Sequence, residues 1–280
     1  MTRFCKISLT TIVLLGLFLA LADHLTLKQA LSKALLTPNP SKFLLCGSRN
    51  LEGAADGFAT VNGMTTGGAG GPTVTVTTAA DLDFYGTQPG PYIIQIQGTI
   101  DLSNLANSLH ATSNKTFVGL GANATVIGGF GFYGVSNIIV QNLTITNSIN
   151  VGEGDGITIK NAAHHIWVDH CTLFDCPDGE IDITVGSDYV TISWCKFYYT
   201  VNTSHDFVNL IGASDSDSGN YYVTFHHNWW STLCVERMPS VRFGHAHIYN
   251  NYYNTPGNNY NIRVRIASEC LIENNYFEGL

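Results

Sequence analysis

The segment HHIWVDHCTL (residues 164–173) contains a short apolar run, WVDH, whose pattern recurs along the chain. Aligning seven such runs by their last residue gives steps of 23, 28, 24, 33, 23 and 24 residues. The aligned last residues are Gly119, Asn142, His170, Trp194, His227, Asn250 and Asn274. One β run in every 20 to 30 residues or so is typical of a parallel β-solenoid, whereas the strands of a sandwich or barrel recur every 8 to 12 or so. We therefore predict an all-β solenoid over residues 53–280.

Stacked coils also account for two residue preferences. Asparagines at the ends of runs would form amide ladders between coils that are about 4.8 Å apart. Paired aromatic residues, such as Trp229-Trp230 and Tyr252-Tyr253, would stack in the same way.

The composition limits the class of protein. Of the 280 residues, 45% are hydrophobic and 12% are charged, which is enough apolar material for a core and argues against a disordered chain. The formal charge of −8 argues against a nucleic-acid partner. We expect a protein that binds neither nucleic acid nor membrane, with a monomer as the default state.

The N-terminus has the features of an export signal over residues 1–22. Arg3 and Lys6 precede a short apolar run, and Ala20-Leu21-Ala22 offers a small-x-small cleavage site. The run is too short for a membrane-spanning helix, so the alternative of a membrane anchor is less favoured. We expect a secreted, extracellular protein in which residues 23–52 form a leader or an N-terminal cap.

Cysteines and sequons fit an oxidising compartment. Removal of the signal leaves six cysteines, an even number, from which one to three disulfides are expected. Four sequons would suit a glycoprotein. The cysteines are Cys46, Cys171, Cys176, Cys195, Cys234 and Cys270, and the sequons begin at Asn114, Asn123, Asn142 and Asn202.

Acidic residues recur at about one period in two glycine-containing motifs. They are Glu153 and Asp155 in GEGDGI (152–157), and Asp178, Glu180 and Asp182 in DGEIDIT (178–184). Residues one coil apart become neighbours on a solenoid surface, so these carboxylates are expected to converge. Such a cluster repels itself unless it holds a cation, and oxygen ligands without His or Cys favour Ca²⁺. The alternative is a solvated acidic face.

Arginines are concentrated farther along the chain. Arg237 and Arg242 flank Pro239, and NIRVR (261–265) supplies Arg263 and Arg265. Cations beside an acidic metal site suit a polyanionic ligand, although salt bridges with the acidic cluster are the alternative role.

Taken in order, these motifs resemble those of the pectate lyase family of right-handed parallel β-helix enzymes. The resemblance covers roughly residues 55 to 280 and rests on GEGDGI, HHIWVDHCTL, DGEIDITVGSDYVTISW, NLIGASDSD, YVTFHHNWW, ERMPSVRFGHAHIYNNYY and LIENNYFEG. It implies Ca²⁺-dependent β-elimination of α-1,4-polygalacturonate (pectate), with 4,5-unsaturated products. By position, Asp155, Asp178 and Asp182 match calcium ligands, Glu153 matches a further acidic ligand, Arg237 matches the catalytic base, and Arg242 and Arg265 match substrate-binding arginines.

Three features depart from the family pattern. Phe207 stands where many members have a substrate-binding lysine, and Glu180 stands where an apolar residue is usual. We expect Glu180 either to add a ligand or to face solvent. Members usually continue past the position of Leu280, so we expect a C-terminal end that is truncated relative to the family.

Other functions remain as alternatives. A pectin lyase would act on methyl-esterified substrate without calcium, which the three aspartates disfavour. A polygalacturonase would need paired carboxylates and a nucleophilic water. A secreted, non-catalytic polysaccharide-binding β-helix would have no reason to keep Arg237 beside a calcium cluster. His226 and His227 are not expected to catalyse; we expect one to form a hydrogen bond within the coil and the other to cap a loop.

Overall fold

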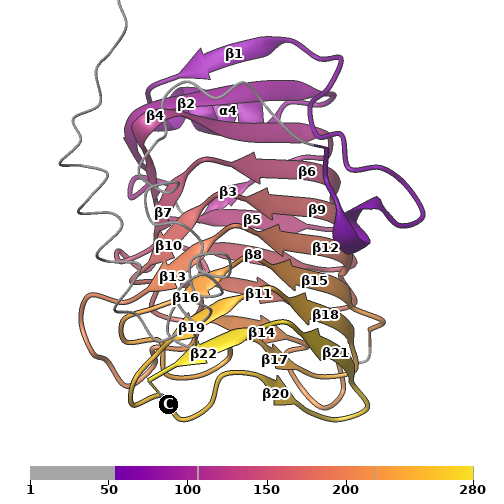
Figure 1. The fold of residues 1–280 in the computed structure, drawn as a ribbon. Helices are drawn as coiled ribbons and strands as arrows, with labels where there is room; N and C mark the ends of the chain where they lie inside the picture. Colours follow the sequence, from indigo (N-terminus) through magenta and orange to yellow (C-terminus); the bar gives the residue numbers. More distant parts are fainter. Residues whose placement is uncertain (1–53, 106, 218, 280) are drawn as a thin grey trace, which may run out of the picture.

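The computed structural model describes residues 54–105, 107–217 and 219–279 (Figure 1). The predicted export signal, the leader and Cys46 lie outside these residues. Within them, no helix is both long enough and apolar enough to cross a membrane.

Parallel strands wind into a β-helix with three faces, which confirms the predicted fold class (Figure 1). The first face contains β4 (Lys115–Ile127), β6 (Ser136–Gln141), β9 (His164–Asp169), β12 (Asp188–Ser193), β15 (Tyr222–His226), β18 (His245–Tyr249) and β21 (Glu269–Glu273). The second face contains β7 (Thr144–Thr146), β10 (Thr172–Phe174), β13 (Lys196–Tyr198), β16 (Trp229–Trp230), β19 (Tyr252–Asn254) and β22 (Tyr276–Glu278). The third face contains β3 (Leu109–His110), β5 (Phe130–Tyr133), β8 (Ile157–Lys160), β11 (Ile181–Ile183), β14 (Asn209–Ile211), β17 (Ser240–Val241) and β20 (Arg263–Val264).

The strand register agrees with the alignment of the seven sequence runs. On the first face, Gln141 pairs with Asp169, and Asp169 pairs with Ser193, so the residues that follow them stack in the predicted order. The same register continues through β15, β18 and β21. The 33-residue step is longer than the preceding step because the loops on both sides of β14 are longer, the one between β13 and β14 and the one between β14 and β15.

The stacked asparagines differ from the prediction by one residue. The aligned residues after the first, from Asn142 to Asn274, adopt left-handed backbone conformations with φ between 52° and 56°. The amide ladder is formed instead by the residues that follow three of them. Asn228 Nδ2 donates to Asn251 Oδ1 at 3.1 Å, and Asn251 Nδ2 donates to Asn275 Oδ1 at 2.9 Å.

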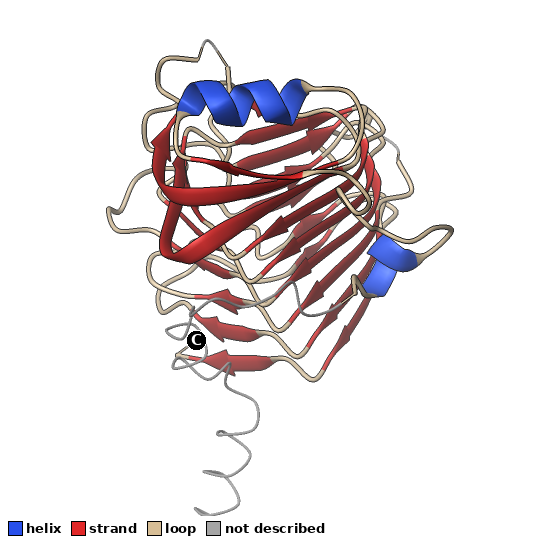
Figure 2. Ribbon diagram, turned by 90° about the horizontal axis from the view of Figure 1, so that it is seen from above, coloured by secondary structure: helices blue, strands red, loops and turns tan. Residues whose placement is uncertain are grey.

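The interior is filled by inward-facing side chains that stack from coil to coil. Phe197, Trp230, Tyr253 and Phe277 form one such stack, with successive ring centroids 5.4, 4.7 and 4.6 Å apart. At the N-terminal end, helix α4 (Ala79–Thr87) lies across the coils and packs against β2 (Tyr92–Asp101) and β3, burying Leu82 (Figure 2). Strand β1 (Thr73–Val76) pairs with β2.

A segment that we call the strap, residues 55–68, runs over the outer side of the first face and includes the 3₁₀ helix η1 (Gly57–Thr60) (Figure 1). Its backbone N–H groups bond to side chains of successive coils. Gly68 donates to Thr116 at 2.9 Å, Gly67 to Asn137 at 2.7 Å, Ala59 to Thr191 at 3.1 Å and Phe58 to Thr224 at 3.0 Å. The strap is therefore held by side chains from several strands of that face.

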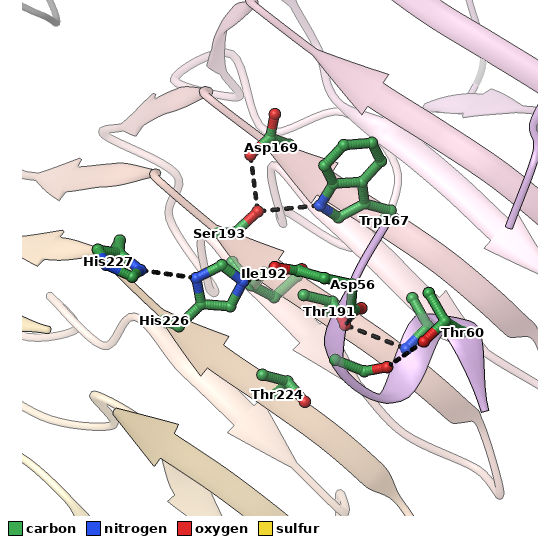
Figure 3. Close-up of polar contacts among 12 residues, drawn as sticks. Asp56, Thr60, Trp167, Asp169, Thr191, Ile192, Ser193, Thr224, His226 and His227 are labelled. Carbon is green, nitrogen blue, oxygen red and sulfur yellow. Dashed lines mark hydrogen bonds and ion pairs between the residues drawn. The ribbon is translucent and has the colours of Figure 1, made fainter. Parts of the chain in front are cut away.

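His226, the last residue of β15, and His227, which follows it, help to attach the strap to the first face. His226 Nε2 lies 2.9 Å from Asp56 Oδ1, and His226 Nδ1 lies 2.8 Å from His227 Nδ1 (Figure 3). Burial, and next the charge of His226, lower the pKa of His227 to about 4. Both histidines lie at the first face and make hydrogen bonds, as expected for one of them, while the predicted loop cap does not appear among these contacts.

The five cysteines in the described part of the chain are unpaired, so none of the expected disulfides forms among them. Four are buried and act as small core residues. For example, the thiol of Cys195 donates to Ser193 O at 3.2 Å.

Candidate functional site

The predicted site residues gather along the outer side of the third face. Strand alternation turns Ile181 and Ile183 into the core and Asp182 outward. Asp182 is in register with Leu210 of β14, and Leu210 is in register with Ser240 of β17. The acidic residues therefore precede the arginines along the axis, with β14 between them.

Asp155 and Asp182 form the centre of the acidic end. Asp155 precedes β8 and accepts a hydrogen bond on Oδ2 from the Thr158 hydroxyl at 2.6 Å, while its Oδ1 is buried and has no hydrogen-bond partner. Asp182 Oδ1 accepts from the Leu210 N–H at 3.0 Å. Burial, and next the charge of Asp182, raise the pKa of Asp155 well above its ordinary value. Burial also raises the pKa of Asp182, which Arg237 opposes.

Gly179 leaves room between these two carboxylates. A Cβ atom at this position would lie 2.6 Å from Asp182 Oδ1 and 3.2 Å from Asp155 Oδ1. Both oxygen atoms therefore line one small space that only glycine leaves open.

Asp178 lies at the edge of this space and is half exposed. Its Oδ1 lies 3.2 Å from Nε2 of His205, in the loop before β14, which is within ion-pair distance but does not have the geometry of a hydrogen bond.

Glu153 and Asp155 both lie before β8, outside any strand. The expectation that the two share one side of a strand fails because both precede β8, in a turn where side chains do not alternate. Glu153 instead forms an ion pair with Lys160 and accepts from the Tyr133 hydroxyl at 3.5 Å. Its role as a metal ligand stays a prediction.

Glu180 does not face solvent, which corrects one of the two expectations for it, while its role as an added ligand stays a prediction. Its side chain is fully buried, and its Oε1 accepts from the Cys176 N–H at 3.4 Å. Burial raises the pKa of Glu180 to about 8, which favours the neutral acid.

Across the described residues, no three carboxylate, imidazole or thiol groups are arranged as a metal site. Calcium nevertheless fits the groups around Gly179, because an all-oxygen donor set suits this ion and Asp155 Oδ1 is buried without a partner.

Arg237 begins the basic end and reaches back toward β14. Its backbone has φ 60°, and its carbonyl accepts from the Asn209 N–H at 2.6 Å. The guanidinium carbon lies 4.7 Å from the centroid of the Phe207 ring. A cation–π contact therefore holds this side chain.

Arg242 and Arg265 follow registered positions in neighbouring coils. Arg242 Nη1 donates to Gly212 O at 2.9 Å, and its Nε lies 3.2 Å from Asp215 Oδ1. Partial burial, and next the charges of Arg242 and Arg263, lower the pKa of Arg265. Two adjacent guanidinium groups of this kind form a site for an anion.

The sequence interpretation missed the contacts that orient these groups. His205, Phe207 and Asp215 lie in loops, and nothing in their spacing indicates that they touch Asp178, Arg237 and Arg242.

The fold and the site together define a class: a three-faced parallel β-helix protein whose outer face carries aspartates and arginines that suit an anionic ligand. A family model described as pectate lyase matches residues 32–279. The chain belongs to the pectate lyase family.

Individual relatives agree with this assignment. The chain is 40% identical to a pectate trisaccharide-lyase of Bacillus licheniformis over 239 residues, which is 80% of this chain and 67% of the relative. It is 38% identical to a pectate trisaccharide-lyase of Thermotoga maritima over 201 residues, 68% of this chain and 53% of the relative. The chain thus spans about half the length of the Thermotoga protein.

Solved structures show the same architecture. A pectate lyase from Bacillus sp. N165 in complex with trigalacturonate superposes with a TM-score of 0.70 at 28% identity, over 80% of this chain and 75% of that one. The cedar pollen allergen Jun a 1 gives a TM-score of 0.65 at 29% identity, over 78% of this chain and 69% of that one.

Proposed function

We propose that this chain is a pectate lyase that cleaves α-1,4-polygalacturonate by Ca²⁺-dependent β-elimination. The observation that carries the proposal is the placement of three aspartates and three arginines on one outer face. The names of the relatives, and the trigalacturonate bound to one structural neighbour, support the choice of substrate.

Asp155, Asp178 and Asp182 would hold calcium, which would neutralise the substrate carboxylate and so make the adjacent C5 proton more acidic. Arg237, in its neutral form, abstracts that proton. The electron pair forms the C4–C5 double bond as the C4–O bond breaks, and the departing oxygen takes a proton from water. Arg242 and Arg265 bind and orient substrate carboxylates.

The arginine base has a consequence for pH dependence. A free arginine side chain is protonated at neutral pH, so the fraction able to act as a base increases with pH. We expect an alkaline optimum, and a rate profile that peaks below about pH 6 would contradict this role for Arg237.

The test is the absorbance of unsaturated uronides at about 235 nm during incubation with polygalacturonate, with Ca²⁺ and then with EDTA. We expect a rise that EDTA abolishes and that Arg237→Ala eliminates. Arg263→Ala is the matched control, because Arg263 is exposed and lies over Tyr260. No rise from folded protein would refute the proposal.

We also propose that the protein is exported and acts as a monomer. The support is the signal-like pattern of residues 1–22 and the extracellular location of a pectin substrate.

A further inference from the structure

The arginine end of the candidate site already has an anion beside it, and this anion belongs to the chain itself. Arg242 and Arg265 follow registered positions of β17 and β20, and the Asp215 carboxylate lies beside the first of them, with Oδ1 3.2 Å from Arg242 Nε. Burial and the two neighbouring arginines lower the pKa of Arg265, whereas the charge of Asp215 opposes them. Asp215 therefore interacts with both guanidinium groups that are proposed to bind substrate carboxylates.

The contact between Asp215 and Arg242 is a weak one for two such groups. Arg242 Nε has no hydrogen-bond partner among the described residues, so the carboxylate is at ion-pair distance without the geometry of a hydrogen bond. The Arg242 side chain is 12% exposed, whereas that of Asp215 is 68% exposed. The carboxylate thus keeps most of its water, and such a pair contributes little free energy. A carboxylate aligned with the guanidinium forms two parallel hydrogen bonds and would bind it better.

The loop that carries Asp215 is anchored on one side only. Asp217 Oδ2 accepts from the Val185 N–H at 2.9 Å and from the Ala213 N–H at 2.8 Å. The Asp217 N–H donates to Ser214 O at 3.1 Å, which closes a turn with Asp215 at its second position. The end of the turn is therefore fixed while its tip is exposed. Because exposed side chains change rotamer readily, the carboxylate can swing away without opening a coil.

We propose that Asp215 is an internal competitor of the substrate, whose carboxylate pairs with Arg242 in the free protein and is exchanged there for a carboxylate of the polyuronate. The pair must be broken before the substrate binds, so it lowers the affinity of the arginine end. Asp215 takes no part in the proton transfer. The inference rests on the proposed function, because it requires a substrate carboxylate to bind Arg242.

The first test is Asp215→Asn, which removes the charge and keeps the shape of the side chain. We expect the KM for polygalacturonate to fall about threefold, the scale of one partly exposed ion pair, while the rate at saturating substrate does not fall. If Asp215 served only to position Arg242, the variant would raise KM or lower the saturating rate. Either result, or an unchanged KM, would overturn the inference. Asp83→Asn removes the same charge from α4, at the N-terminal end of the β-helix, and should leave KM unchanged.

A double-mutant cycle shows whether the effect acts through Arg242. Calorimetry would measure the binding of trigalacturonate to the wild type, Asp215→Asn, Arg242→Gln and the double variant, in EDTA so that no calcium-dependent cleavage occurs. We expect Asp215→Asn to tighten binding about threefold in the wild type and less beside Arg242→Gln. An equal or larger gain beside Arg242→Gln, or no binding by any of the four proteins, would refute the competition. If the wild type formed no unsaturated product, the proposed reaction would fail, and these binding constants would still decide the inference.

Discussion

Replacing Asn251 by alanine removes the central rung of the amide ladder. Its side chain makes four hydrogen bonds. It accepts from Asn228 N at 2.9 Å and from Asn228 Nδ2 at 3.1 Å, and it donates to Phe225 O at 3.0 Å and to Asn275 Oδ1 at 2.9 Å. Asn251 is 1% exposed, so water cannot replace these bonds without opening the coil.

Each bond contributes about 1 kcal/mol net, and the Asn228 N–H would be left buried without its acceptor. We therefore expect Asn251→Ala to lower the free energy of unfolding by about 3–5 kcal/mol. The assay is urea denaturation followed by circular dichroism and tryptophan fluorescence, with the slope of the transition compared between variants.

Asn275→Ala is the matched control at the outer end of the same ladder. Asn275 also makes hydrogen bonds through its side chain, but it is partly exposed, so water can satisfy the groups left behind. We expect a cost of about 1–2 kcal/mol. Equal costs at the two positions, or a cost below about 1 kcal/mol at Asn251, would show that the ladder does not stabilise the coils as argued.

Calcium should raise the melting temperature of the wild type, and Asp155→Asn should abolish this increase. The same variant should stabilise the calcium-free protein at neutral pH, because it removes a carboxyl group whose ionisation is opposed first by burial and next by the charge of Asp182. Differential scanning fluorimetry with and without EDTA measures both effects, and a retained calcium response would remove Asp155 from the site. His227, with a pKa lowered from 6.5 to about 4, stays neutral in the folded state while the unfolded state takes up a proton, so stability present above pH 6.5 is lost as the pH falls toward 4. Because the ring is partly exposed, we expect the free energy of unfolding to fall by about 1–2 kcal/mol over this pH range. Urea titrations at neutral and acidic pH should show a smaller fall in His227→Asn, and the same pH dependence in both proteins would contradict this role of His227. Lys115→Met should lower the free energy of unfolding in urea by about 3 kcal/mol, because the buried ammonium makes three hydrogen bonds. Lys196→Met removes cation–π contacts and should lower it by about 1 kcal/mol, and the reverse order would refute the role of Lys115.

The coil register was predictable because each coil repeats the same physical solution. An apolar run must face the core, and the chain must then turn at a corner, so the end of each run marks a fixed structural position. Gly119 to Asn274 could therefore be aligned by eye, even though one step has 33 residues. The left-handed conformation at these corners also explains the frequent asparagines, since Asn tolerates positive φ better than most residues.

The carboxylates were harder to place because alternation holds only in extended strands. Glu153 and Glu180 lie in turns, where the backbone redirects side chains, and one ends against Lys160 while the other enters the core. The contact between Phe207 and Arg237 has no sequence signal, since it depends on how a loop side chain leans across to the next coil. An even number of cysteines likewise says nothing about whether thiols serve as core residues.

The strap changes how the coils depend on one another. In a solenoid each coil contacts only its neighbours, so coils can open one after another from an end. The strap adds bonds between residues 48, 132 and 166 positions apart in the sequence, from Gly68, Ala59 and Phe58. Opening a coil beneath it would break contacts that several coils share, which makes unfolding more nearly all-or-none.

The same feature orders events during synthesis. The strap is made before any of the coils that it covers, and its partner at the far end, His226, follows Asp56 by 170 residues. Contacts of such large sequence separation form slowly, because the intervening chain must first become ordered. The strap therefore closes only after β15 has joined the stack, and its docking marks the point at which the nascent coils become a single cooperative unit.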